Sequence, residues 1–452
     1  MKNRTMTRCV AAAGSLAGPT REEHLKKELS SSPPRRRFSV PFHLLALLGV
    51  GALAGLTGCD TLLEVEIPGQ VEESELNDPS LANTMVVSAV GEFECAFSSY
   101  VATTAVLTEE FIVSTFFLNA NIWGWRGDVE IQGTAGSCPN SRSASGLGYY
   151  TPLQRARFLA DDGAARIRNF SDAEVPNRTA LLAELAAYAG YSYTLLGEGF
   201  CEMSVDNGPL MTPVEVLETA EERFSEAIQL AQQVGDQEIL NMSYVGRARV
   251  RLNLGRSAEA ASDAAQVPEG FVKYVEHSEV RPRRENRIYN LTDADFMSVG
   301  PNYRGLELTE GVPDPRVLVE FSGADGQDGV TPQWDQLKYG ARSANKPLAS
   351  WVEAQLILAE AEGGSEGLNA INRVRDHQGL PTLDASEVSD FLEIVLEERR
   401  RQLFLEGHRY NDMLRHGIPF PTGTNHKGQS YGNVTCVPLP DVERLNNPNI
   451  AN

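Results

Sequence analysis

The sequence predicts a mainly α-helical protein whose paired helices are interrupted by loop-rich segments. Apolar residues recur at helical spacing from about 151 to 268, and the same period returns from 350 to 406. The segments 114–150 and 269–348 lose the period and are rich in Gly, Ser, Asn or Pro. We therefore expect a scaffold of helix pairs with two irregular inserts.

The first long helix is expected over 81–106. Asp78 and Pro79 precede it, and an acidic residue and a proline suit the start of a helix. Apolar residues such as Met85, Ala89 and Phe93 then recur at spacings of four. The insert 114–150 that follows is expected to be a long loop with short helical pieces.

Four further helices are expected over 179–197, 214–233, 239–254 and 257–267, with Gly197 as the C-cap of the first. The third ends in Leu-Asn-Leu-Gly, and the fourth carries Ala258, Ala261 and Ala265 on its expected contact face. A helix ending in this way, a tight turn and a second helix with small residues resemble a tetratricopeptide repeat. An unrelated helical hairpin is the alternative.

The C-terminal part is expected to hold helices over 350–362, 366–377 and 386–406. Before them, Val312-Pro313-Asp314-Pro315-Arg316 predicts a turn that enters a strand at 317–321. From Gly417 the chain is rich in Pro and Gly, which predicts coil.

The N-terminus predicts export. Arg35, Arg36 and Arg37 precede an apolar run from Phe38 to Leu56, which ends in Leu56-Thr57-Gly58-Cys59. This ending resembles the bacterial lipobox, in which the cysteine becomes the acylated first residue. We expect 1–58 to be removed, with 1–34 reflecting an upstream start, and 59–452 to form a single domain lipidated at Cys59. An uncleaved membrane anchor is the alternative.

Charge excludes several classes of partner. The 452 residues carry a formal charge of −21, and removing 1–58 leaves 31 basic against 58 acidic residues, a charge of −27. A nucleic-acid binder needs a basic face, so that class is excluded. Anionic headgroups would repel such a body, so we expect the lipid alone to hold it at a membrane.

No catalytic residue, cofactor or metal site is predicted. Cys95, Cys138, Cys201 and Cys436 form no zinc-binding pattern, and an exported compartment permits three disulfide pairings among them. The segment 325–329 suggests a calcium loop but lacks the full ligand spacing. Adjacent glutamates and isolated histidines do not supply a catalytic pair.

The last expected helix places an arginine within an apolar stripe. Leu392, Val395 and Arg399 share one helical face, and a buried arginine needs an acceptor. We predict a partly buried ion-pair network in which Glu406 and Asp412 serve Arg399.

This segment resembles the SusD/RagB family of outer-membrane nutrient-binding lipoproteins. The residues that match the family's C-terminal pattern are Glu398, Arg399, Leu403, Glu406, Gly407, Arg409, Asp412 and Arg415. Three further segments agree: Asp314-Pro315-Arg316, the helix ending in Ala359-Glu360-Ala361, and Ile371-Asn372-Arg373-Val374-Arg375 with Gly379-Leu380-Pro381. Ser350-Trp351-Val352 departs from the family's usual helix start. The matched residues are scaffold, so ligand identity stays open.

The resemblance implies a SusD-like fold, in which tetratricopeptide-like pairs form a right-handed scaffold beside a loop-rich ligand-binding half. It also implies a non-catalytic lipoprotein of the outer membrane that faces the extracellular side. Such a protein captures a glycan or peptide for a SusC-like TonB-dependent transporter. Aromatic rings suit sugar binding, and the candidates are Trp123, Trp125, Tyr149, Tyr150 and, as a second choice, Trp334. The alternative is an assembly lipoprotein without a small ligand, and a glycan-degrading enzyme is least favoured.

Overall fold

The computed structural model describes residues 73, 75–127, 135–387 and 390–450. Residues Val71–Asn452 form one compact unit. The predicted signal sequence and Cys59 lie outside the described residues. Within the described ranges, no helix combines the length and apolar character needed to cross a membrane.

The unit is mainly α-helical, which confirms the predicted fold class. Its helices are α2 (Ala82–Leu107), α3 (Leu118–Trp125), α5 (Tyr150–Arg168), α6 (Arg178–Gly199), α7 (Pro213–Val234), α8 (Gln237–Asn253), α9 (Ser257–Ala264), α10 (Arg287–Asp293), α11 (Trp351–Glu362), α12 (Gly364–His377), α13 (Phe391–Gln402), α14 (Arg409–Arg415) and α15 (Asp441–Asn446). Its strands are β1 (Phe111–Val113), β2 (Val272–Val275), β3 (Met297–Val299), β4 (Glu307–Thr309), β5 (Val312–Pro313), β6 (Val319–Asp325), β7 (Pro332–Gln336) and β8 (Lys346–Ser350).

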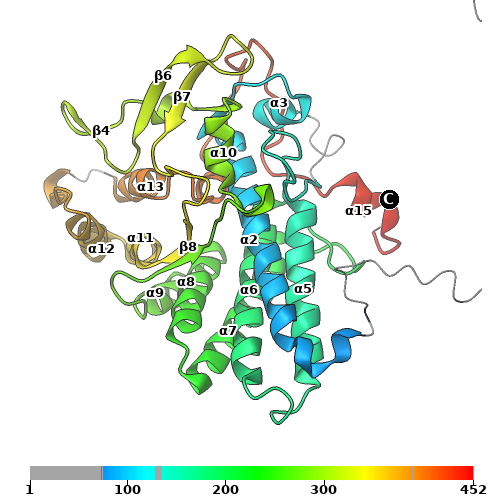
Figure 1. Ribbon diagram of the computed structural model, residues 1–452. Helices are drawn as coiled ribbons and strands as arrows, with labels where there is room; N and C mark the ends of the chain where they lie inside the picture. The colour runs from blue at the N-terminus through cyan, green and yellow to red at the C-terminus, as the bar shows by residue number, and fades with distance from the viewer. Residues whose placement is uncertain (1–72, 74, 128–134, 388–389, 451–452) are drawn as a thin grey trace, which may run out of the picture. The chain divides into compact units, whose positions relative to one another are not determined.

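Successive helices pack on one another. α2 lies against α5, α5 against α6, α6 against α7, α7 against α8 and α8 against α9. α11 then packs on α9 and α12, and Figure 1 shows the long helices side by side below the strands. The handedness of this scaffold stays a prediction.

Small residues let α6 and α9 pack closely on their neighbours. The structure corrects the predicted end of α6 and the predicted contact residues of α9. A Cβ on Gly197 would lie 2.8 Å from Leu217 of α7, so this glycine permits a close helix crossing, and α6 continues to Gly199 instead of ending there. Gly190 of α6 and Gly246 of α8 leave room for the buried ring of Phe224. In α9 the buried alanines are not Ala258 and Ala265, which are exposed, but those at 260, 261 and 264.

In the described residues the strands form four antiparallel pairs: β1 with β3, β2 with β8, β4 with β5, and β6 with β7. The pair β2–β8 packs against α8, whereas β6 and β7 lie at the far end from the long helices (Figure 1). In the β6–β7 hairpin, Phe321 lies opposite Trp334. The short helix α3 packs closely against β1. Gly124 of α3 permits this contact, because a Cβ at this position would lie 2.8 Å from the Val113 side chain. Among its described residues the segment 114–150 contains α3 between loops, and 269–348 contains short strands and α10.

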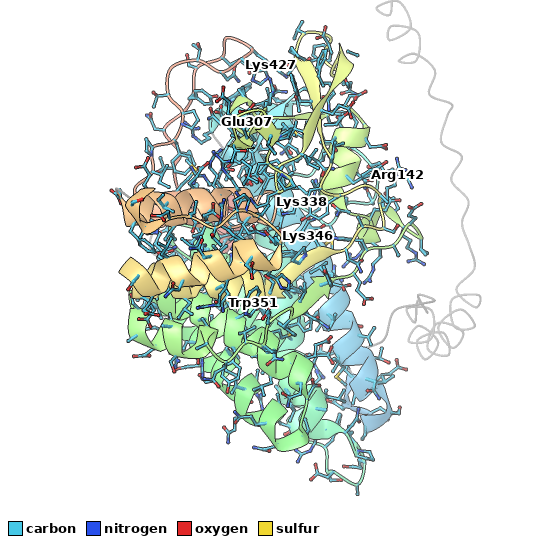
Figure 2. All side chains as sticks on the ribbon, turned by 90° about the vertical axis from the view of Figure 1, so that its left-hand side faces the viewer. Arg142, Glu307, Lys338, Lys346, Trp351 and Lys427 are labelled. Atoms are coloured by element: carbon cyan, nitrogen blue, oxygen red, sulfur yellow. A yellow bond between two sulfur atoms is a disulfide. The ribbon has the colours of Figure 1, made fainter. Side chains whose placement is uncertain are left out.

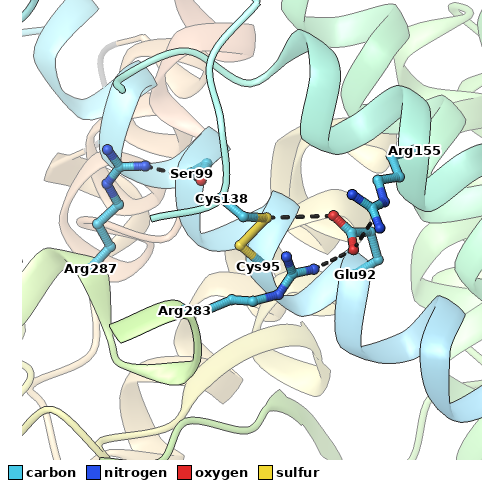
Figure 3. The surroundings of a disulfide bond; sticks show 7 residues. All are labelled: Glu92, Cys95, Ser99, Cys138, Arg155, Arg283 and Arg287. Atoms are coloured by element: carbon cyan, nitrogen blue, oxygen red, sulfur yellow. Dashed lines mark hydrogen bonds and ion pairs between the residues drawn. A yellow bond between two sulfur atoms is a disulfide. The ribbon is translucent and has the colours of Figure 1, made fainter. Parts of the chain in front are cut away.

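Two disulfides resolve the cysteine pairing that the sequence left open. Cys95 of α2 pairs with Cys138, and Cys201 pairs with Cys436. Beside the first bridge, Glu92 forms ion pairs with Arg155, at 3.5 Å, and with Arg283 (Figure 3). Both bridges tie loop segments to the helical scaffold.

Helix α13 is shorter than predicted. Asp390 caps its start by accepting from the backbone N–H groups of residues 392 and 393, and the helix ends at Gln402 rather than at 406. Leu405 and Gly407 then adopt positive φ angles of 57° and 86°. These two residues turn the chain sharply into α14.

Candidate ligand-binding surface

Three of the predicted ligand-binding aromatics are buried. Trp123 and Tyr149 are 1% and 0% exposed, and their rings lie 6.0 Å apart in the main core. The Tyr149 hydroxyl donates to the Gly199 carbonyl at 2.8 Å, and that of Tyr150 donates to Glu443 at 2.8 Å. Trp123 was expected in a loop, but α3 turns its indole inward. Trp123 and Tyr149 are therefore core residues, whereas Tyr150 is 5% exposed and lines a cavity of about 400 Å³ with Gln154 and Phe158.

The other two predicted aromatics are half-buried and partly covered. The Trp125 ring lies on the backbone of Gly127, where a Cβ would come within 2.3 Å of its Nε1. Trp334 packs on Phe321, with centroids 5.4 Å apart, and the guanidinium of Arg304 lies 5.2 Å from its centroid.

Exposed aromatic rings occur instead immediately after β1. Phe116 is 75% exposed and Phe117 39%, and Leu118 beside them is 57% exposed. Across from them lie the exposed Gln327 and Val330, in the turn between β6 and β7. We call these five residues the Phe116 surface. Such an exposed apolar group is typical of an interaction site.

The two sides of the Phe116 surface are joined directly. The Thr115 hydroxyl donates to the Gln327 side chain, and the Asp328 N–H donates to the Ser114 carbonyl at 2.9 Å. The Phe117 ring rests edge-on against Phe296, with centroids 5.5 Å apart. The aromatic residues therefore stand on a base fixed by both backbone and side-chain contacts.

A partly buried ion pair completes this base. The Lys427 ammonium contacts Asp328 at 2.7 Å and donates to the Thr115 carbonyl at 2.8 Å and to Asn121 at 3.1 Å. Burial acts to raise the pKa of Asp328, but Lys427 and the N–H groups of Val330 and Thr331 outweigh it, so the pKa is lowered. Figure 2 places Lys427 at the loop-rich end.

The same contacts explain why the suggested calcium loop is not organised as one. The Asp328 carboxylate is already engaged by Lys427, by the Thr331 hydroxyl at 2.8 Å and by two backbone N–H groups. Across the residues that the structure describes, no group of three or more His, Cys, Asp or Glu side chains could hold a metal ion.

The predicted ion-pair network exists, with one partner changed. Arg399 and Asp412 form two hydrogen bonds of 2.9 Å, with both side chains buried. Glu360, not Glu406, is the second carboxylate near Arg399, at 3.8 Å. Glu406 instead pairs with Lys338 at 2.6 Å, because the turn after α13 carries it away from the Arg399 face.

Glu398 belongs to a neighbouring pair of contacts. Its carboxylate binds Arg316 at 2.7 Å and Arg375 at 2.6 Å. Arg316 also binds Asp314, so the Asp-Pro-Arg turn, α12 and α13 are held together. The matched sequence segments therefore meet in space, and all of these contacts are structural. Arg409 alone, among the predicted motif residues, makes no ion pair or hydrogen bond within the described part of the chain.

Stacked helix pairs, a loop-rich end and this buried C-terminal network define a SusD-like fold. Residues 348–438, from β8 through α14 into the C-terminal segment, match the SusD family. The resemblance to the SusD/RagB family is thus confirmed. The matched residues include Arg399, Asp412 and Glu360, whereas Asp314, Arg316 and Lys338 lie before the matched segment. No functionally curated protein matches this chain.

Solved structures with the same fold align over most of the chain. A SusD-like carbohydrate-binding protein from Bacteroides vulgatus has a TM-score of 0.60 and 15% identity, covering 82% of this chain and 97% of its own. A SusD superfamily protein from Bacteroides fragilis has a TM-score of 0.61 and 13% identity, covering 83% and 99%. Surface glycan-binding protein A from Bacteroides thetaiotaomicron, solved with laminarihexaose, has a TM-score of 0.58 and 13% identity, covering 82% and 98%.

The sequence predicted ligand-binding residues in the segment after β1, but not the exposed rings of Phe116 and Phe117 within it. Phe116 and Phe117 stand between Ser114-Thr115 and Asn119, and aromatic residues flanked by polar turn residues were the available signal. The tryptophans were predicted to bind ligand because they are large aromatic residues, but large aromatic residues often fill a core.

Proposed function

We propose that this chain is a lipid-anchored, non-catalytic binding protein that captures an oligosaccharide. One observation carries the proposal: the exposed pair Phe116 and Phe117 stands on a fixed base at the loop-rich end of a SusD-like fold. Aromatic rings bind the apolar faces of sugar rings, and the adjacent Gln327 amide can hydrogen-bond hydroxyl groups. A relative by fold is a surface glycan-binding protein, which supports this ligand class.

We further propose that the captured glycan passes to a SusC-like TonB-dependent transporter in the outer membrane, with the binding protein on the extracellular side. The predicted signal sequence and Cys59 support the anchoring, and the rigid helix pairs offer a surface suited to a large partner.

Calorimetric titration with laminarihexaose and with maltohexaose tests glycan capture. Phe116→Ala and Phe117→Ala are each expected to weaken binding about tenfold or more, since exposed aromatics at binding sites carry much of the affinity. The matched control is Phe158→Ala, an aromatic of 48% exposure on α5 in the helical half. Equal affinities for all three variants and the parent would refute the Phe116 surface as the site.

Co-purification from membranes tests the partner. A tagged chain is expected to bring down a transporter-sized β-barrel, and Cys59→Ala is expected to release the chain from the membrane fraction. Recovery of a different partner, with no glycan bound in the titrations, would favour the assembly lipoprotein instead.

A further inference from the structure

A cavity separate from the Phe116 surface is lined by Arg409, which makes no hydrogen bond or ion pair in the part of the chain that the structure describes. It has a volume of about 350 Å³ and lies where the end of α2, α13, α14 and the C-terminal segment meet. Its lining includes Glu109, Tyr303, Arg400, Arg409 and Met413. The volume falls within the range of small-molecule sites, about 300–1,000 Å³.

Arg409 is half-buried at the start of α14, and Met413 lies one turn later on the same face. Within the described ranges its guanidinium makes no hydrogen bond or ion pair. The nearby Glu110 accepts from the Leu405 N–H at 2.8 Å and from the Thr108 hydroxyl at 3.2 Å. Burial raises the pKa of Glu110 and the charge of Arg409 acts to lower it, so the two groups interact electrostatically without a hydrogen bond or ion pair in the described part of the chain. The donors of Arg409 are therefore available to a ligand.

A second polar group in the same cavity has spare capacity as a donor. Tyr303 is 2% exposed, and its hydroxyl makes no hydrogen bond of ordinary geometry in the described part of the chain, although the Arg400 guanidinium interacts with it. The Arg400 guanidinium lies 5.0 Å from the Tyr303 ring centroid. Burial raises the pKa of Tyr303, so the hydroxyl stays protonated and can donate. A buried hydroxyl without an acceptor is costly, and a ligand oxygen would satisfy it.

The other charges of the cavity are already engaged. Arg400 makes two hydrogen bonds to Glu397, at 2.6 and 2.7 Å, and one to the Asn302 carbonyl at 2.9 Å. The Glu109 carboxylate accepts from the Tyr431 hydroxyl. The Arg409 guanidinium and the Tyr303 hydroxyl remain as donors beside apolar lining from Met413, Pro419 and Pro421, and the Glu109 carboxylate keeps its negative charge in the same cavity.

We propose that this cavity binds the carboxylate of an acidic sugar unit within the captured glycan, with Arg409 and the Tyr303 hydroxyl as its donors. A planar carboxylate matches the guanidinium fork, and the apolar lining suits the C–H face of a saturated ring. Glu109 lines this cavity and also a small pocket that Asn121 lines. The Asn121 amide donates to the carbonyls of Thr115 and Phe117, so this pocket links the cavity to the base of the Phe116 surface. The inference rests on the proposed function and names its substrate class, a uronate-containing oligosaccharide.

Titration of the full chain with trigalacturonate and with its neutral trimethyl ester tests the inference. The parent protein is expected to bind the acid about tenfold or more tightly than the ester. Arg409→Gln is expected to remove that preference, and Tyr303→Phe, which deletes only the hydroxyl, to reduce acid affinity about three- to tenfold. Neither variant should change ester affinity. Arg168→Gln, which removes a charge at the end of α5, is the matched control.

The remaining outcomes separate the two proposals. Equal affinity for acid and ester, unchanged in Arg409→Gln, would overturn the carboxylate site and leave glycan capture intact. Tight binding of an oligoglutamate peptide that depends on Arg409, without uronate binding, would overturn the sugar assignment. No binding of trigalacturonate, its ester, laminarihexaose or maltohexaose would overturn glycan capture and the acidic subsite together.

Discussion

Replacing Arg399 with methionine removes the centre of the buried C-terminal network. The Arg399 and Asp412 side chains are 5% and 2% exposed, so the substitution leaves a carboxylate buried without its main partner. Breaking one side of a buried pair costs about 3–5 kcal/mol. Asp412 keeps a contact with Arg415 at 3.2 Å, and Glu360 keeps Arg415 and His416. We therefore expect the lower end, about 3 kcal/mol.

The expected change in melting temperature follows from the size of the unit. An unfolding entropy of about 2.1 cal/mol/K per residue over about 380 residues gives about 0.8 kcal/mol/K, so 3 kcal/mol lowers the melting temperature by about 4 °C. Differential scanning calorimetry and urea unfolding measure this loss. The control, Arg168→Met, breaks a partly exposed pair with Glu226 and should cost less than about 1 kcal/mol.

A double variant sharpens the test. Arg399→Met combined with Asp412→Leu leaves no unpaired charge at this pair, so it should be more stable than the sum of the two single variants predicts. If Arg399→Met has the same melting temperature as the Arg168→Met control, the network does not stabilise the fold and the reasoning from burial is wrong.

Two further predictions concern pH and the disulfides. Burial raises the pKa of Glu353 from 4.5 to about 8, so the folded state holds a proton that the unfolded chain loses near pH 4.5. The free energy of unfolding should therefore fall as pH rises from about 4.5 to 8. Urea unfolding at several pH values measures this slope, and Glu353→Gln should remove it. A slope that is unchanged in Glu353→Gln would contradict the assignment to Glu353. Serine at both Cys201 and Cys436 opens a bridge of sequence separation 235, against 43 for Cys95–Cys138. Loop entropy gives a loss of stability of about 5 kcal/mol for opening Cys201–Cys436 and about 4 kcal/mol for opening Cys95–Cys138. Opening Cys201–Cys436 should therefore lower the melting temperature more. The reverse order would refute the loop-length argument.

Helix prediction succeeded where one face of the segment is buried. α7 begins at Pro213 behind a Thr212–Glu215 capping box and ends before Gly235 in the left-handed region, all of which is local chemistry visible in the sequence. The predicted C-cap at Gly197 was wrong, because a glycine near a helix end can either cap the helix or allow a close contact with another helix. Its real partner, Leu217, lies across a helix interface that no local pattern shows.

The partners of charged residues were harder to predict than the residues themselves. Arg399 was recognisable because an arginine on an apolar stripe requires an acceptor. Choosing between Glu406 and Glu360 required the positive φ angles of Leu405 and Gly407, which the motif does not reveal. Phe116 was missed for the opposite reason: an exposed ring makes few contacts, so folding places little constraint on its surroundings.

The two arginines of the C-terminal motif show how one segment can carry both stability and binding. Arg399 faces the helices and has two carboxylates within 4 Å. Arg409 follows the turn at Leu405 and Gly407 and lies instead near the buried Glu110, whose pKa its charge acts to lower. In the described part of the chain the Arg409 guanidinium makes no hydrogen bond or ion pair, so its donors face the cavity that we propose binds a carboxylate. The same short motif therefore supplies one arginine to the buried network and one to the proposed ligand site.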